Sequence, residues 1–216
     1  MKYEQWEPYY KAILEDFGWT PEGDEQAARI MAPMLPDPAQ TLVRLRKLID
    51  GRDVLVCGKA PRLKEDLKEI DRSKYTVIVA DGATSTLLAA GIVPDIIVSD
   101  LDGSHADLLK ANAQGAIVLA HAHADNVPAV REMVPKLKNV IGTTQARPFD
   151  HVYNFGGFSD GDRCVFLAKE FGARSIRIIG FDLGDTNVTP KKLKKLKWAG
   201  KLLKVLDINA EQFIRQ

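Results

Sequence analysis

The chain has 216 residues, 45% of them hydrophobic and 27% charged, which is typical of a globular protein and not of a disordered or fibrous one. The formal net charge of +1 gives no overall electrostatic reason to expect nucleic acid or an anionic membrane as partner. The charged start MKYEQWEPYY does not resemble a signal peptide, and no apolar run reaches membrane-spanning length. Cys57 and Cys164 are far apart in apolar surroundings, so we expect reduced thiols in a soluble, cytoplasmic protein.

The first fifty residues are predicted to form a helical segment. Apolar and aromatic side chains recur there at helical spacing, as at Trp6, Tyr10, Ile13 and Phe17. Three prolines interrupt the pattern: Pro21, Pro36 and Pro38. We therefore divide the chain into a helical N-terminal segment, 1–50, and a second domain, 51–216.

After residue 51 the sequence changes to short runs rich in β-branched residues. Seven such runs follow one another: DVLVCG, YTVIVADG, PDIIVSD, AIVLAHA, NVIGTT, HVYNFGG and SIRIIGFD. Stretches of helical length separate several of them, including 63–70, 84–90 and 127–137. Strands that alternate with helices predict an α/β fold, with a mostly parallel sheet and helices flanking both faces.

Polar residues follow several of the predicted strands. Gly58 follows the first strand, Asp81 the second, Asp100 the third and His121 the fourth. In open α/β sheets ligands bind at the carboxyl ends of the strands. We therefore expect these residues to meet at one functional edge.

Asp100 and Asp102 are separated by one residue at the end of a strand. Extended residues two apart point the same way, and Gly103 permits a sharp turn, so the two charges would share a small space. Turn formation alone would explain the pair. Asp81 and Asp125 at the ends of neighbouring strands instead favour a magnesium site, because this hard cation prefers oxygen ligands.

His121 and His123 are also two residues apart. Zinc normally takes three or four protein ligands, and neither cysteine has metal-ligand spacing, so hydrogen bonding to a phosphate or ring is the better functional interpretation. A structural alternative, with one histidine in the core and the other exposed, stays open.

The segment FGGFSDGDRC, 155–164, precedes an apolar helical pattern. A Ser or Asp before a helix first of all caps its N-terminus, which explains one of these polar residues and not all of them. Gly157 permits close backbone approach to a ligand, and Phe158 can contact a flat ring. The segment therefore predicts a substrate loop.

Two basic segments each have two interpretations. CGKAPR places Gly58, Lys59 and Arg62 at a helix start, which suits an anion site or a solvated turn, although the Walker spacing is absent. A lysine-rich helix is predicted over 191–204, with no carboxylate between Asp185 and Asp207. Its basic face is either solvated or directed at phosphate.

Four segments together resemble the archaeal 6-hydroxymethyl-7,8-dihydropterin pyrophosphokinases: VADGATSTLLAAGIVPDIIVSDLDG, AHAHADN, GGFSDGDRC and IIGFDLG. The resemblance covers Asp53 to Leu206. The first segment is similar, more distantly, to thiamin pyrophosphokinase signatures. The resemblance implies that 51–216 form a thiamin pyrophosphokinase-like catalytic domain, which uses Mg²⁺ to transfer diphosphate from ATP to the hydroxymethyl group of a reduced pterin, releasing AMP.

The resemblance also implies roles for single residues. Asp100, Asp102 and Asp125 would hold Mg²⁺, and Asp81 would help to position ATP or the metal's waters, so these four are the candidate catalytic residues. The phosphates would meet four others: Gly58, Lys59, His121 and His123. The acceptor would meet a further set: Gly82, Gly157, Phe158, Asp160 and Asp162. Three departures leave substrate detail open: Ala124 and Ser159 differ from the family pattern, and Ser99 stands where the thiamin enzymes have Gly.

Two rival functions stay open beside this one. An Asp-x-Asp pair such as Asp100 and Asp102 also holds the metal of a nucleotide sugar in glycosyltransferases. The same carboxylates would equally serve a nucleotide-sensing module without turnover. The oligomeric state is left open, a homo-oligomer included.

Overall fold

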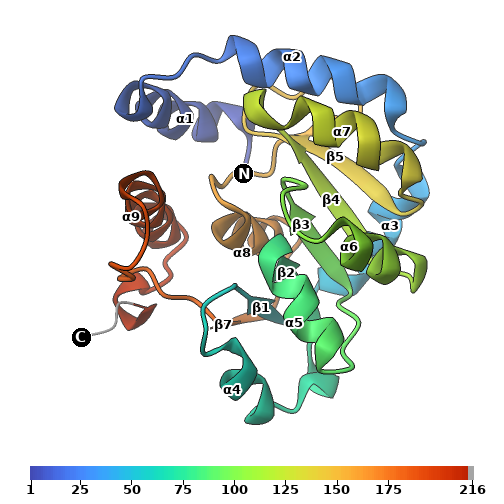
Figure 1. Cartoon of the computed structure of the whole chain (residues 1–216), viewed down its shortest axis with the longest axis vertical. Coiled ribbons are helices and arrows are strands. Elements are labelled where there is room, and N and C mark those ends of the chain that lie inside the picture. The colour runs from blue at the N-terminus through green and yellow to red at the C-terminus, as the bar shows by residue number, and fades with distance from the viewer. Residues whose placement is uncertain (214–216) are drawn as a thin grey trace.

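The computed structural model describes residues 1–213, in which a seven-stranded sheet lies between helices on both faces (Figure 1). The strand order is β6-β5-β4-β3-β2-β1-β7, and every neighbouring pair is parallel. The strands are β1 (Asp53–Cys57), β2 (Thr76–Ala80), β3 (Ile96–Ser99), β4 (Ile117–Ala122), β5 (Val140–Thr144), β6 (Val152–Tyr153) and β7 (Ser175–Ile179). Each of the seven predicted runs contains one of them, so the predicted α/β fold is confirmed.

Helices connect and cover these strands. The α-helices are α1 (Tyr3–Phe17), α2 (Glu22–Met31), α3 (Ala39–Ile49), α4 (Leu63–Lys68), α5 (Thr84–Ala89), α6 (His105–Ala113), α7 (Val127–Met133), α8 (Asp160–Glu170) and α9 (Pro190–Val205). Short 3-10 turns are η1 (Ala32–Met34), η2 (Arg72–Lys74), η3 (Asp81–Ala83), η4 (Ala124–Asn126), η5 (Val134–Lys136) and η6 (Ala210–Phe213).

The sheet has an apolar core on each face. Successive strand residues point to opposite faces, so Leu55 and Val79 pack with α2 and α4 to α7, whereas Val56 and Ile78 pack with α3, α8 and α9. Because both faces are covered, the strands are apolar along most of their length and do not alternate with polar residues.

The order of the strands positions the functional edge. Strands β1 to β6 follow one another across the sheet, and α8 then leads the chain back to β7 beside β1. The chain therefore leaves β1 towards β2 on one side, and it returns at its last strand, β7, to pair with β1 on the other side. In such sheets the ligand crevice lies at the carboxyl ends of the strands where the order reverses.

The N-terminal segment is helical, as predicted, and shares the cores of the sheet. Helix α2 joins one core and α3 the other. Helix α1 packs through Trp6 against Phe166 of α8, in a cluster that also holds Trp198 of α9. Whether 1–50 and 51–216 are separate folding units stays a prediction. In the part of the chain described, no helix is long and apolar enough to cross a membrane.

Candidate active site

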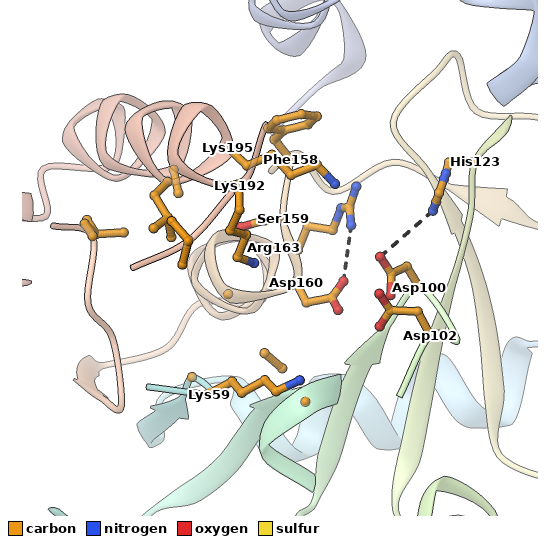
Figure 2. Close-up of a pocket in the computed structure, with 18 of the residues that line it drawn as sticks. Lys59, Asp100, Asp102, His123, Phe158, Ser159, Asp160, Arg163, Lys192 and Lys195 are labelled. Atoms are coloured by element: carbon orange, nitrogen blue, oxygen red, sulfur yellow. Dashed lines mark hydrogen bonds and ion pairs between the residues drawn. The ribbon is translucent and has the colours of Figure 1, made fainter. Parts of the chain in front are cut away.

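A cavity of about 790 Å³ opens at the carboxyl edge of the sheet (Figure 2). Its walls come from the ends of β1, β3, β4 and β7, from the start of α8, and from α2 and α9. The predicted site residues that line it are Gly58, Lys59, Gly82, Asp100, Asp102, His123, Asp125, Phe158 and Asp160. The sheet edge predicted from the polar strand ends is therefore hollowed, and most of the predicted residues face the hollow.

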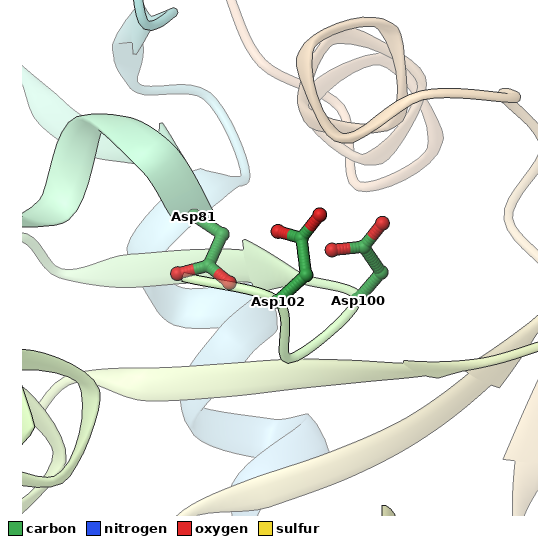
Figure 3. A group of neighbouring side chains, drawn as sticks. All are labelled: Asp81, Asp100 and Asp102. Carbon is green, nitrogen blue, oxygen red and sulfur yellow. The ribbon is translucent and has the colours of Figure 1, made fainter. Parts of the chain in front are cut away.

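Three carboxylates form a cluster, shown in Figure 3, and two of them, Asp100 and Asp102, line the cavity. Asp81 follows β2 directly, and Asp100 and Asp102 lie on the turn after β3. One ligand oxygen from each lies within 4.8 Å of those of the other two. Oxygen donors this close together suit a hard divalent cation, because like charges at such distances repel without one.

The turn that carries the cluster is fixed by buried hydrogen bonds. Ser99 Oγ donates to Asp81 Oδ2 at 2.7 Å and accepts from the Leu101 amide at 2.9 Å. The buried Leu101 has a φ of 64°, a left-handed conformation that costs a non-glycine residue about 1 kcal/mol or more. Ser99 thus ties Asp81 to the turn that presents Asp100 and Asp102.

Burial and mutual repulsion perturb these carboxylates. Burial raises the pKa of Asp81. Burial, and then the charges of Asp100 and Asp81, raise the pKa of Asp102 to about 6. Asp100 Oδ1 is buried and has no hydrogen-bond partner among residues 1–213. This unpartnered oxygen and the closeness of the three carboxylates are what a cation site held by Asp81, Asp100 and Asp102 would show.

Asp125 lies apart from this cluster. It is exposed in η4 and lines the cavity, whereas Asp81, expected to help the metal site, is one of the three clustered carboxylates. The metal role of Asp125 stays a prediction that this arrangement does not support.

The two histidines take different positions. His121 is buried, with Nδ1 3.1 Å from Thr143 Oγ1, and it does not line the cavity. His123 does line it, with Nε2 3.9 Å from Asp100 Oδ2 and Nδ1 accepting from the Asp125 amide. Burial lowers the pKa of both rings. The alternative of one core histidine therefore describes His121, while His123 keeps a position suited to a ligand.

The predicted substrate loop is shaped by its own carboxylate. Asp162 is fully buried and accepts from the amides of Phe158 at 2.6 Å and Ser159 at 2.9 Å. Gly157 has a φ of 89°, and a Cβ there would lie 2.7 Å from Arg163 Cα. Asp162 thus caps α8, so its predicted contact with the acceptor gains no support, whereas Phe158 and Asp160 line the cavity.

The loop after β1 approaches the loop after β7 closely. A Cβ on Gly58 would lie 2.5 Å from the Gly180 carbonyl oxygen, so the backbones meet without side chains between them. Lys59 then extends beside Gly82 and lines the cavity. Its positive charge lowers the pKa of Asp102, although burial and the neighbouring carboxylates raise that pKa by more. Arg62 instead pairs with Asp66 at 2.8 Å. Of the two cationic residues in CGKAPR, Lys59 is therefore the one positioned to bind an anion in the cavity.

The lysine-rich helix α9 turns part of its basic face towards the cavity. Lys192 and Lys195 of α9 line the cavity. Lys191 and Lys194 lie over the rings of Trp19 and Phe17, at 5.1 and 4.8 Å from the ring centroids. Burial, followed by the Arg163 charge, lowers the pKa of Lys195.

Comparison with known proteins decides the family. The sequence pattern described as "6-hydroxymethylpterin diphosphokinase MptE-like" matches residues 31–188. A protein from Pyrococcus furiosus named 6-hydroxymethyl-7,8-dihydropterin pyrophosphokinase is 41% identical, over 97% of this chain and 96% of the relative. A protein of the same name from Methanothermobacter thermautotrophicus is 39% identical, over 98% of this chain and 97% of the relative. One from Methanocaldococcus jannaschii is 42% identical, over 85% and 81%. The chain belongs to the MptE-like family.

A solved structure of MAf glycosyltransferase from Magnetospirillum magneticum is also similar. It aligns with a TM-score of 0.46 at 18% identity, over 76% of this chain and 29% of that chain. Likeness at this level carries no argument about function.

Asp24, Gln145 and Arg163 are among the residues of this MptE-like site that were not predicted from the sequence. Arg163 lies within the quoted GGFSDGDRC segment, so its motif was a signal that pointed to it. Asp24 and Gln145 belong to no recognised segment and reach the cavity only because α2 and the end of β5 pack beside it.

Proposed function

We propose that the protein transfers diphosphate from ATP to the hydroxymethyl group of 6-hydroxymethyl-7,8-dihydropterin and releases AMP, with Mg²⁺ held by Asp81, Asp100 and Asp102. The observation that carries this proposal is the carboxylate cluster facing cationic side chains across one cavity, in a chain of the MptE-like family. Two free, buried cysteines support a cytoplasmic location.

The charges of the cavity suit a nucleotide polyphosphate. Bound Mg²⁺ would neutralise phosphate oxygens and orient the β-phosphorus for in-line attack. Lys59, Lys192 and Lys195 line the same cavity and offer positive charge to the remaining oxygens. Such transfers depend on positioning and on electrostatic stabilisation, and charged side chains grouped around one cavity can supply both.

The acceptor would meet the wall formed by Trp19, Phe158 and Asp160. The ring centroids of Trp19 and Phe158 lie 6.2 Å apart, and both residues line the cavity. A flat pterin can contact such rings, and its amino group and ring nitrogens can pair with a carboxylate. Asp160, which lines the cavity beside Arg163, is the candidate for that pairing, because the Asp162 carboxylate is taken by backbone amides.

The test is a matrix of donors and acceptors. Purified protein would be incubated with Mg²⁺ and either ATP or a nucleotide sugar, together with the hydroxymethyl dihydropterin or thiamin, and the products weighed by mass spectrometry. We expect a pterin diphosphate with ATP, and thiamin to be a poor acceptor, since a site built for the pterin's hydrogen bonds penalises ligands that lack them. Sugar transfer would support the glycosyltransferase, and binding of ATP without any product would support the sensing module.

Lys192 and Lys195 allow a test of whether the lysines of α9 that line the cavity contribute to ATP binding. Changing both to Gln is expected to raise the KM for ATP about 2–10-fold at low salt, and the difference should fade towards 1 M salt, where the screening length is about 3 Å. The control changes Lys197 and Lys204, which lie on the same helix but do not line the cavity. Equal KM values for the two double variants at low salt would show that the basic face is only solvated.

A further inference from the structure

The cavity wall opposite the carboxylate cluster holds a buried arginine with unused hydrogen-bond donors. We propose that Arg163 is a catalytic residue that binds the phosphate groups of the donor, and that Asp24 is a positioning residue that holds Arg163 through Gln145. The inference rests on the proposed diphosphate transfer and adds residues that neither the family resemblance nor the metal site assigns.

Arg163 is held from two sides and keeps donors free. It lies in the first turn of α8, and its side chain is 9% exposed. Nη1 donates to Asp160 Oδ1 and Nη2 to Gln145 Oε1, both at 3.2 Å. Nε is buried and has no partner among the residues described. A guanidinium has five N–H donors, so its orientation is fixed while donors remain for a ligand.

Arg163 lies across the cavity from the carboxylates that are proposed to hold the cation. Figure 2 shows its guanidinium beside Asp160, on the side of the cavity that faces Asp100 and Asp102. Within residues 1–213 its one ion pair is with Asp160, although two further carboxylates lie across the cavity. A phosphate between Arg163 and the cation held by the cluster would meet positive charge on both sides. Arginine suits this position because its planar fork binds two phosphate oxygens at once.

Gln145 takes its orientation from Asp24. Gln145 Nε2 donates to Asp24 Oδ2 at 2.7 Å, so the amide nitrogen faces Asp24 and the amide oxygen faces Arg163. Asp24 also accepts from Tyr10 Oη at 2.8 Å and from the Ala124 amide at 3.0 Å. Asp24 and Gln145 are each 5% exposed. A buried chain of hydrogen bonds therefore runs from α1 and α2 to Arg163, which gives the N-terminal segment a part in the site.

The test separates phosphate contact from acceptor contact. Arg163→Gln is expected to lower kcat for diphosphate transfer about 10²–10³-fold, with the KM for the pterin within about twofold of the wild type, as for loss of one fixed transition-state donor. Arg163→Lys should recover part of kcat, because it keeps the charge without the fork. The control is Arg174→Gln, which removes another Asp-paired arginine from an exposed position. A kcat near the wild type for Arg163→Gln, or a raised pterin KM alone, would overturn the phosphate role.

A binding measurement gives a readout without turnover. Calorimetry with inorganic pyrophosphate should show affinity weakened at least about tenfold in Arg163→Gln and unchanged in Arg174→Gln. If the wild type transfers no diphosphate but its pyrophosphate affinity depends on Arg163, the proposed function fails and the phosphate role stands. Pyrophosphate affinity that is equal in all three proteins overturns the phosphate role, whatever the activity. Arg163→Lys serves for the same comparison if the Gln variant unfolds at a lower temperature.

A double-mutant cycle tests the positioning role of Asp24. Asp24→Asn places an amide nitrogen against donors, so Gln145 is free to turn and kcat should fall about tenfold at unchanged pterin KM. If Asp24 acts through Arg163, the same change made in Arg163→Gln should lower kcat by less than about twofold more. Fully additive losses would show that Asp24 only supports the fold, and would overturn its positioning role.

Discussion

Asp102→Asn is expected to lower the rate of diphosphate transfer about 10²–10³-fold, because metal ligation contributes several kcal/mol of charge stabilisation in the transition state. The substitution keeps the shape of the side chain and removes its charge from the three-carboxylate cluster. Losing one ligand should weaken Mg²⁺ binding more than it disturbs the fold. The measurement is kcat over a range of Mg²⁺ concentrations, and Asp100→Asn should behave in the same way.

The matched control is Asp150→Asn, which changes an exposed aspartate outside the cavity and should leave kcat unchanged. Near-normal turnover of Asp102→Asn at saturating Mg²⁺ would remove Asp102 from the metal site. Asp125→Asn adds a direct comparison, because Asp125 was predicted from the sequence to hold the metal but lies outside the cluster. If its loss is as large as that of Asp102→Asn, the metal site includes η4.

Saturating Mg²⁺ is expected to raise the unfolding temperature by about 5–10 °C at pH 7.5. A ligand at about 100 times its dissociation constant stabilises the native state by about 2.7 kcal/mol, and a chain of this size gains about 2–4 °C per kcal/mol. The physical reason is the repulsion within the cluster, which a bound cation relieves. The measurement is thermal unfolding in EDTA and in Mg²⁺. Asp100→Asn should show a much smaller rise.

The same cluster predicts how the metal-free protein depends on pH. The pKa of Asp102 is raised from 3.8 to about 6 in the folded state, so its protonated form is favoured by folding. Its contribution to stability is therefore fully present below pH 3.8 and is lost as the pH rises through 6. Burial shifts the pKa of Asp81 in the same direction. In EDTA, the wild type should lose stability over this window relative to Asp102→Asn, and parallel curves for the two proteins would contradict the repulsion.

The parts of the fold that follow local rules were predictable from the sequence. Each buried strand appears as an apolar run, because parallel strands covered on both faces have no solvent side. The meeting of Asp81 with Asp100 and Asp102 follows from parallel strands that end at one edge. The same rule, applied to every polar strand end, also placed His121 in the site, although its side chain does not line the cavity. A residue's position at the end of a strand does not by itself show whether its side chain points into the core or into the cavity.

The remaining site residues depend on contacts between distant segments. Asp24 and Gln145 are 121 positions apart, and their hydrogen bond exists only because α2 packs beside the end of β5. Asp162 shows the opposite case: its motif suggested contact with a ligand, but its carboxylate accepts from the amides of Phe158 and Ser159 and caps α8. Local propensity predicts caps and strands, whereas the partners of a buried polar group are set by tertiary packing.

The position of a label tests the central claim most directly. The protein would be incubated with Mg²⁺, 6-hydroxymethyl-7,8-dihydropterin and ATP labelled at the β-phosphate, and the nucleotides and pterin products separated. Attack on the β-phosphorus in one step predicts labelled pterin diphosphate together with unlabelled AMP. Labelled ADP with a singly phosphorylated, unlabelled pterin would show attack on the γ-phosphorus and contradict the account.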